Sequence, residues 1–255
     1  MTKIDESLKY FTVLFQIRTD YFQYIKAVLL YRLRRKVEFP KAVVRLKGAK
    51  FIAREKSMDI AHLSNFYERK TTNLLLKLKP KILVDVGAHI GRFSIILAKR
   101  GSKVISIEPN KYTLEQLKKN VKLNNLQDKI TIIGYGCSDK NENATLYSVP
   151  QNEGLSSLVK KENARKEKIK VKKLDTICNN LNLSPNSIDV IKIDVEGFEL
   201  NVLKGALNTL KRGSPTLIVE ITDKKKEKPI KEFLAKSGFF NKKILDSRNF
   251  IFTKN

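Results

Sequence analysis

The segment Lys81-Ile-Leu-Val-Asp-Val-Gly-Ala-His-Ile-Gly91 decides the fold. It joins a short apolar run to a turn with two glycines, and the residues from Arg92 onward have the pattern of a helix. A short continuous apolar run is typical of a strand buried on both faces in a parallel sheet. Glycine lets the backbone turn tightly and lets a ligand approach closely. The segment therefore predicts a strand, a ligand-binding turn and a helix in succession.

Strand and helix patterns alternate through the rest of the chain. We expect further core strands over residues 104–107, 129–133, 188–193 and 216–221, and helices over 92–99, 112–124, 200–210 and 229–237. An antiparallel excursion is expected at 144–148 and 169–171, and two short strands within 243–253. This order predicts an α/β fold, a doubly wound Rossmann-like sheet that is mostly parallel, with an antiparallel C-terminal strand.

Residues 1–79 differ in character and are predicted to form a basic, mainly helical extension, which leaves residues 80–255 as the main domain. Short helices are expected at 10–17, at 20–36 and at 64–78, and a hairpin at 42–53. The second helix is basic, with apolar positions at Phe22, Ile25, Val28, Leu29 and Leu33. It either packs this apolar face on the main domain, the more frequent arrangement, or lies against an anionic ligand or membrane surface.

The composition narrows the class of protein. The chain has 255 residues, with 51 Lys and Arg against 26 Asp and Glu, a formal charge of +25 that attracts nucleic acid and anionic lipid headgroups. Two cysteines and two histidines, far apart in sequence, exclude a disulfide scaffold and a zinc-finger type site. No apolar run reaches the roughly 18 residues that span a bilayer, and no cleavable signal is recognised. We therefore expect a cytoplasmic protein, with a peripheral membrane location as the alternative.

Polar residues follow the predicted strands at the edge where doubly wound sheets bind ligands. Glu108 ends the second core strand, in the place where a carboxylate accepts hydrogen bonds from ribose hydroxyls and repels the 2′-phosphate of NADP. The turn at Gly87 has neither the dinucleotide fingerprint nor the Gly-Lys-Ser/Thr of a phosphate loop. The glycine turn and the acidic residue Glu108 together predict a nucleoside ligand.

A third feature is the segment Lys192-Ile-Asp-Val-Glu-Gly-Phe-Glu199. Strand alternation places Lys192 and Asp194 on the same side. Crowded carboxylates cost free energy unless they share protons or meet a cation, and a sulfonium ligand with an ammonium group would be such a cation. Stabilisation of a helix N-terminus explains Glu199 but explains Asp194 and Glu196 less well.

The order of these segments resembles that of FkbM-type methyltransferases, which are class I enzymes that use S-adenosylmethionine (SAM). The resemblance is carried by Asp85-Val-Gly-Ala-His-Ile-Gly91, Glu108-Pro-Asn110, Cys137-Ser-Asp139, Gly154-Leu-Ser-Ser-Leu158, Leu174-Asp175, Ile191-Lys-Ile-Asp-Val-Glu-Gly-Phe-Glu199 and Val219-Glu-Ile221. Residues 194–199 are its most specific part. His89 stands where this family often carries Asn.

The resemblance implies a SAM-dependent methyltransferase and the residues of its site. The expected cofactor contacts are Asp85, Gly87, Ala88, His89, Gly91, Glu108, Pro109, Asn110, Gly136, Cys137, Ser138, Asp139 and Asp194. Residues 87–91 would hold the methionine end, Glu108 the ribose, and residues 136–139 would flank the adenine, while Asp194 would lie near the methionine ammonium and the reacting methyl. Lys192, Glu196 and Glu220 would face the acceptor.

The expected catalytic residues are Glu196, Asp194 and Lys192. An alcohol acceptor needs a group to take its proton, and Glu196 or Asp194 is the predicted base, with His89 a weaker candidate. Asp194, Glu196 and Glu220 are compatible with a catalytic metal ion, but nothing in this chemistry requires one.

Three functions stay open on the sequence. Known members of the family mostly methylate hydroxyls of sugars and secondary metabolites, so the resemblance implies O-methylation of a sugar, a glycan or a lipid-linked sugar. The positive charge favours an RNA methyltransferase instead, although the chain has no Asn/Asp-Pro-Pro-Tyr/Phe motif and no paired catalytic cysteines. A non-catalytic module that binds an anionic surface is the third.

Overall fold

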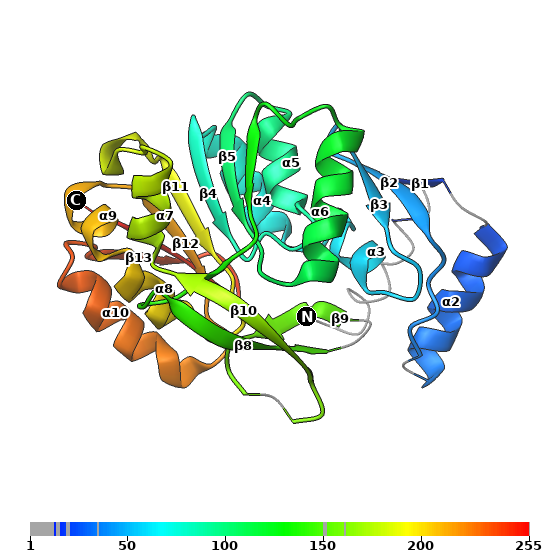
Figure 1. The fold of residues 1–255 in the computed structure, drawn as a ribbon. Coiled ribbons are helices and arrows are strands. Elements are labelled where there is room, and N and C mark those ends of the chain that lie inside the picture. Colours follow the sequence, from blue (N-terminus) through cyan, green and yellow to red (C-terminus); the bar gives the residue numbers. More distant parts are fainter. Residues whose placement is uncertain are drawn as a thin grey trace.

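A seven-stranded sheet forms the centre of the computed structural model, which describes residue 13 and residues 16–18, 21–34, 36–149, 152–160 and 162–254. Its strand order is β13-β14-β12-β11-β4-β5-β6 (Figure 1). The strands are β4 (Ile82–Val86), β5 (Lys103–Ile107), β6 (Ile130–Ile133), β11 (Val190–Ile193), β12 (Thr216–Glu220), β13 (Asn241–Ile244) and β14 (Asn249–Thr253).

This order confirms the predicted fold class. From β6 to β12 the five parallel strands follow the order 3-2-1-4-5 of a doubly wound sheet. Strand β14 pairs antiparallel with β12, as expected for the C-terminal strand. These features agree with the fold that the sequence resemblance implies.

Side chains alternate between two hydrophobic layers, one on each face of the sheet. Leu83 and its cross-strand partner Val190 belong to one layer, whereas Val84 and its partner Ile191 belong to the other. The first layer is covered by α4 (Arg69–Leu78), α5 (Arg92–Ala98) and α6 (Lys111–Leu123). The second is covered by α7 (Leu174–Asn180), α8 (Glu199–Gly205), α9 (Leu207–Arg212) and α10 (Glu227–Ala235).

Two of the predicted helices differ in extent from those of the structure. The helix predicted over 200–210 is two helices, α8 and α9, because Ala206 leaves the helical conformation between them with φ −105°. The helix predicted over 64–78 begins only at Arg69, because Glu68 has a left-handed backbone with φ 40°. Helix α7 was not expected at all.

A second sheet lies beyond the carboxyl ends of the central strands, in the order β7-β10-β8-β9 (Figure 1). Its strands are β7 (Gly136–Cys137), β8 (Glu142–Val149), β9 (Asn152–Ser157) and β10 (Arg165–Lys172). The excursion predicted from the sequence is therefore real, but β7 and β9 were missed. Ser157, at the end of β9, donates a hydrogen bond to the backbone carbonyl of Glu196 at 2.7 Å, which fixes this sheet over the end of β11.

In the part of residues 1–68 that the structure describes, a small antiparallel sheet is accompanied by helices. The sheet has β1 (Ile17–Arg18), β2 (Ala42–Leu46) and β3 (Ala49–Ala53), and the helices are α2 (Tyr21–Arg34) and α3 (Asp59–His62). The predicted hairpin is found as β2 and β3. The helix predicted over 10–17 lies mostly outside the described residues, and Ile17 belongs to a strand.

Helix α6 holds this region against the central fold. The side chain of Asn120 accepts a hydrogen bond from the Ile52 N–H at 2.8 Å, and that of Asn124 accepts one from the Lys50 N–H at 2.9 Å, so both satisfy the outer edge of β3. One hydrophobic layer also runs through Phe51 and α5 without interruption. A boundary at residue 79 remains a prediction.

The apolar face predicted for α2 is not the face that packs. Tyr24, Ala27 and Val28 are buried, and the rings of Tyr24 and Tyr31 lie against Phe39. Of the predicted apolar positions only Val28 is buried, and the other four are exposed. No helix among the described residues is long and apolar enough to cross a membrane.

Candidate active site

A pocket opens at the carboxyl ends of β4, β5 and β11, between the central sheet and the second sheet. About 910 Å³ of empty space lies within it, a volume that includes solvent at its mouth. It is lined by His62, Tyr67, Glu68, Val86, Gly87, Ala88, His89, Arg92, Phe93, Ile107, Glu108, Pro109, Gly136, Cys137, Leu146, Gly154, Ser156, Ser157, Leu158, Lys192, Asp194, Val195, Glu196 and Phe198.

Gly87 brings the end of β4 into direct contact with the end of β11. Its backbone has φ +83°, and a Cβ atom at this position would lie 1.8 Å from the carbonyl oxygen of Asp194. The N–H groups of Gly87 and Ala88 both donate to the carbonyl of Ile107, at 2.9 and 3.0 Å. Only glycine fits here. The turn predicted from the sequence therefore forms part of the pocket lining.

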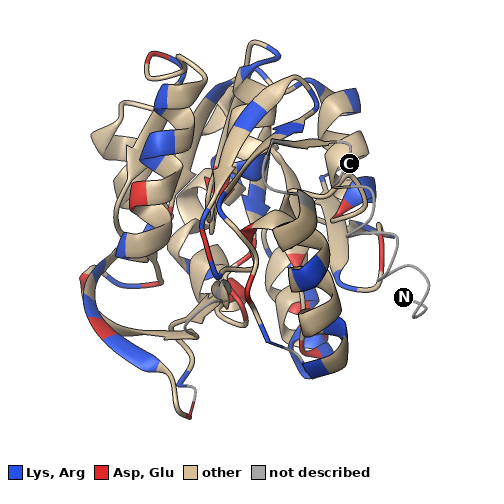
Figure 2. Ribbon diagram, turned by 90° about the vertical axis from the view of Figure 1, so that its right-hand side faces the viewer, with Lys and Arg blue, Asp and Glu red and all other residues tan. Residues whose placement is uncertain are grey.

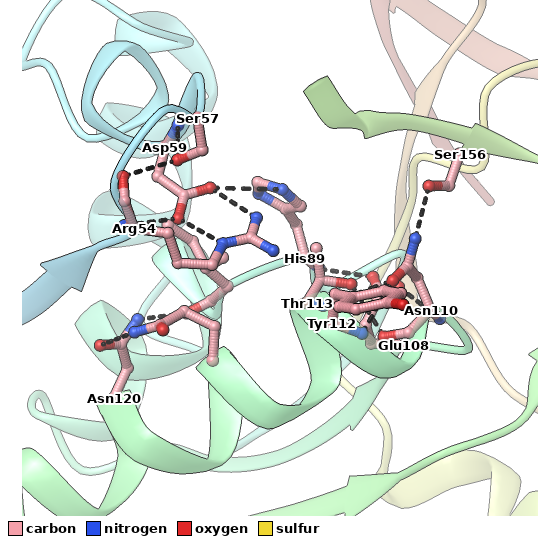
Figure 3. Close-up of polar contacts among 12 residues, drawn as sticks. Arg54, Ser57, Asp59, His89, Glu108, Asn110, Tyr112, Thr113, Asn120 and Ser156 are labelled. Atoms are coloured by element: carbon pink, nitrogen blue, oxygen red, sulfur yellow. Dashed lines mark hydrogen bonds and ion pairs between the residues drawn. The ribbon is translucent and has the colours of Figure 1, made fainter. Parts of the chain in front are cut away.

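Glu108 is fixed by two backbone groups at the end of β5. One carboxylate oxygen accepts a hydrogen bond from the His89 N–H at 2.8 Å, and the other accepts one from the Asn110 N–H at 2.9 Å (Figure 3). Burial raises the pKa of Glu108, and these hydrogen bonds partly offset the rise. The side chain of Thr113 also contributes a hydrogen bond. A carboxylate has about four lone-pair sites, so Glu108 can still accept a hydrogen bond from a ligand hydroxyl.

The His89 ring points away from Glu108, toward a buried ion pair (Figure 3). Its Nε2 lies 3.9 Å from an oxygen of Asp59, which accepts side-chain hydrogen bonds from Arg54 at 2.8 Å. Burial tends to raise the pKa of Asp59, but Arg54 outweighs burial and the pKa is lowered. Burial lowers the pKa of His89 to about 4. His89 is therefore neutral at pH 7 and is a poor proton acceptor.

The two histidines of the chain meet in this pocket. The rings of His62 and His89 lie edge to face, with centroids 5.1 Å apart, although α3 carries one and the glycine turn carries the other. No sequence pattern indicates this contact, because the two residues belong to regions with no shared motif.

Acidic side chains gather around Lys192 at the other end of the pocket. Lys192 is buried, and its Nζ lies 3.1 Å from a carboxylate oxygen of Asp194, which confirms the predicted placement of both on one side of the strand. One carboxylate oxygen each from Glu68, Asp194 and Glu220 lie within 4.8 Å of one another. Asp85 is the register partner of Lys192 on β4. The three clustered carboxylates are close enough to share one cation.

The charges of these groups shift one another's pKa values. Burial raises the pKa of Glu220 to about 9, with further contributions from the charges of Asp194 and Glu68. Burial on its own lowers the pKa of Lys192, but the nearby carboxylates, Asp194 first, outweigh it and the pKa is raised. At neutral pH, Lys192 is therefore charged. The raised pKa favours the protonated form of Glu220, although the guanidinium of Arg248 lies 3.7 Å from one of its oxygens.

Glu196 sits in a strained turn at the pocket wall. Its φ of +52° lies in the left-handed region, which costs free energy for a residue other than glycine, and Gly197 follows with φ +99°. The turn is held by the Ser157 hydroxyl and by Glu199, which accepts a hydrogen bond from the Gly197 N–H at 2.7 Å. Strain of this kind is typical of functional sites.

Most of the predicted site residues line the pocket together. These are Gly87, Ala88, His89, Glu108, Pro109, Gly136, Cys137, Lys192, Asp194 and Glu196. The other five do not line it. Asp85 is buried and accepts a hydrogen bond from Ser94, Gly91 lies against Leu117, Asn110 caps α6, Ser138 follows β7, and Asp139 accepts a hydrogen bond from Asn201. Glu220, which was expected to face the acceptor, is not in the lining of this pocket either. The catalytic and cofactor roles of all these residues, inside and outside the lining, remain predictions.

Sequence reasoning missed the part of the wall that comes from residues 62–68. Arg92, directly after the glycine turn, is buried and donates hydrogen bonds to the carbonyls of His62 at 2.6 Å, Ser64 at 3.0 Å and Tyr67 at 2.8 Å. It thereby holds this segment, and with it Glu68, beside the pocket. No local pattern marks such a contact. Ser156 and Ser157, in contrast, lie in the motif Gly154-Leu-Ser-Ser-Leu158, which by itself indicates no role for them.

Residues 85–246 match the family described as the methyltransferase FkbM domain. The chain belongs to this family. FkbM methyltransferases use SAM as their cofactor, so the family chemistry agrees with a pocket at the carboxyl edge of the sheet.

Individual relatives are distant. The chain is 27% identical over 153 residues to the methyltransferase sdnD of Sordaria araneosa, which covers 48% of this chain and 59% of that protein. It is 29% identical over 133 residues to the tRNA (uracil(54)-C(5))-methyltransferase of Pyrococcus horikoshii, covering 48% of this chain and 32% of that protein. The crystal structure of an FkbM methyltransferase from Methylobacillus flagellatus superposes with a TM-score of 0.47 and 20% identity, covering 69% of this chain and 44% of that one. The chain thus spans well under two thirds of the length of each of these three proteins.

Proposed function

We propose that this chain is a SAM-dependent O-methyltransferase that acts on an uncharged, hydroxyl-rich acceptor such as a sugar or glycan. One observation carries the proposal: a single pocket has an end suited to a nucleoside and an end lined by carboxylates.

The residues of the first end fit SAM. Glu108 offers a carboxylate lone pair to a ribose hydroxyl, and the Gly87 turn admits close approach of the methionine part. Leu146 and Cys137 provide an apolar wall for an adenine. Asp194 is placed to meet an ammonium group. Bound there, SAM supplies an electrophilic methyl group on a sulfonium.

The carboxylate end suits a hydroxyl acceptor. Carboxylates accept hydrogen bonds from hydroxyls, which orients the acceptor, and they repel phosphate groups. Alignment of an acceptor oxygen is worth several kcal/mol in a displacement reaction.

Comparison of the titratable groups favours Glu196 as the base. The Lys192 ammonium engages Asp194, and burial lowers the pKa of His89 to about 4. Burial raises the pKa of Glu68 and that of Glu220, which favours their protonated forms. Glu196 lines the pocket and is not fully buried, so an acceptor hydroxyl in the pocket can come close to its carboxylate.

Methylation of RNA is the second candidate. The charge of +25 favours it, and Figure 2 shows Lys and Arg distributed over helices, strands and loops alike. The tRNA methyltransferase of Pyrococcus horikoshii among the relatives adds support. Against it stand the carboxylates at the acceptor end. Both cysteines are also buried, and burial raises the pKa of their thiols, which makes either a poor nucleophile.

Transfer of a labelled methyl group separates the candidates. The protein is incubated with methyl-labelled SAM and with polysaccharide, lipid and total RNA fractions, with Glu196→Gln as the matched control. We expect label in polysaccharide or lipid-linked sugar with the wild type and strongly reduced label with the variant. Label in RNA that ribonuclease releases would contradict the proposal. Binding of SAM without label in any fraction would favour a non-catalytic module.

A further inference from the structure

Helix α2 has an apolar stripe that faces solvent. Ile25, Leu29 and Leu33 follow one another at intervals of four residues and are 45%, 52% and 81% exposed. At 3.6 residues per turn they lie along one side of the helix. The buried residues Tyr24 and Ala27 occupy the opposite side, where the helix packs on Phe39. The stripe is therefore not the face that attaches α2 to the fold.

Basic side chains border this stripe. By helical spacing, Lys26 lies on one flank and Arg32 on the other, and both are exposed. Arg34 and Lys36 add positive charge at the C-terminal end, and α2 contains no acidic residue. Figure 1 places α2 at the margin of the molecule, beyond the hairpin of β2 and β3.

This arrangement identifies the kind of surface that the helix fits. Single exposed apolar side chains are normal in proteins, but an aligned stripe with basic borders is typical of helices that lie in a membrane surface. The apolar side chains enter the acyl boundary while Lys and Arg contact anionic headgroups.

We propose that α2 is a membrane-surface anchor that inserts Ile25, Leu29 and Leu33 into a bilayer containing anionic lipid. RNA would satisfy the basic borders but not the apolar stripe. A second copy of this chain would cover the stripe but would bring two sets of like-charged borders together. An anionic bilayer can accommodate both the apolar stripe and its basic borders. The anchor is independent of the proposed acceptor.

Vesicle co-sedimentation of the full chain tests the anchor. Vesicles contain phosphatidylcholine alone or a mixture of phosphatidylcholine and phosphatidylglycerol. The test variant is Ile25→Ser/Leu29→Ser/Leu33→Ser. The matched control is Phe240→Ser/Ile244→Ser, which removes apolar side chains that are 64% and 71% exposed at the opposite margin of the molecule, beside β13 (Figure 1).

We expect the wild type and the control to sediment with the mixed vesicles and not with phosphatidylcholine alone. The triple variant should bind the mixed vesicles more than about tenfold more weakly, because binding scales with the apolar area that is buried. Its melting temperature should match that of the wild type, since the changed side chains are exposed, and this shows that the variant is folded.

Three results would overturn the proposal. The first is a wild type that does not bind the mixed vesicles, and the second is a folded triple variant that binds them as the wild type does. The third is a wild-type dimer in sedimentation velocity that the triple substitution dissociates, because it would assign the stripe to a second copy.

Discussion

At the residue scale, the carboxyl groups around the end of β11 differ in their partners and in their surroundings. Lys192 neutralises Asp194, burial raises the pKa of Glu220, and Glu196 stands in a strained turn at the pocket wall. One cluster thereby combines an ion-paired carboxylate, a group with a raised pKa and a carboxylate at the pocket wall. Titratable groups with shifted pKa values that face a pocket are typical of functional sites.

Substitution of Glu196 should separate chemistry from cofactor binding. We expect Glu196→Gln to lower kcat by about 10²- to 10⁴-fold, the usual loss for a general base, and to leave the affinity for SAM within about twofold. Asp194→Asn should weaken SAM binding as well, because it removes a charge facing the methionine ammonium. Steady-state kinetics and calorimetry measure both effects. Near-normal turnover of Glu196→Gln would assign the proton acceptor elsewhere.

Glu220 should make folding stability depend on pH. Its pKa is about 9 in the folded chain and near 4.5 when unfolded, so the folded state binds more protons between these values. The protonated group therefore supports stability at low pH, and this contribution is lost as the pH rises toward 9. Glu220→Gln, which cannot ionise, should gain in melting temperature over the wild type as the pH increases from 5 to 9. A difference that stays constant over this range would show that Glu220 is ionised throughout.

At the element scale, the junction of β4 and β11 depends on Gly87. In Gly87→Ala, alanine would have to adopt a left-handed backbone conformation. Its Cβ atom would also lie 1.8 Å from the carbonyl oxygen of Asp194. Gly48→Ala, in the turn between β2 and β3, has the same backbone strain at φ +85° but meets nothing within 4 Å. We expect Gly48→Ala to cost about 1 kcal/mol of unfolding free energy and Gly87→Ala clearly more, with loss of SAM binding. Denaturant titrations of both variants provide the comparison, and equal costs would contradict the close junction.

The elements that could be predicted from the sequence are those that a local residue pattern determines. The apolar runs of β4, β5, β11 and β12 and the turn at Gly87 follow from local pattern, and the carboxylates near the end of β11 follow from strand alternation. The packing face of α2 did not follow, because apolar residues lie on two sides of this helix and Phe39 selects the side of Tyr24. Neither did the start of α4, since the left-handed Glu68 is held in place by long-range contacts of its segment.

On the scale of the whole molecule, the pocket is built from three separate parts of the chain. The central sheet supplies Glu108 and Asp194, the second sheet supplies the wall that ends at Ser157, and the N-terminal region supplies Glu68. Arg92 and Ser157 tie the two outer parts to the glycine turn and to the end of β11. Only the first part belongs to the motifs that a sequence reveals, so the acceptor end was less predictable than the nucleoside end.

Calorimetric titration of the demethylated product of SAM into the full chain tests the central claim, that this pocket holds the cofactor through Glu108. We predict one site per chain with low micromolar affinity. Glu108→Ala should weaken it by more than about tenfold, because a charge-assisted hydrogen bond to the ligand is lost. Glu115→Ala, which removes an exposed carboxylate on α6, should leave the affinity unchanged. Absence of binding heat for the wild type, or equal affinities for wild type and Glu108→Ala, would contradict the account.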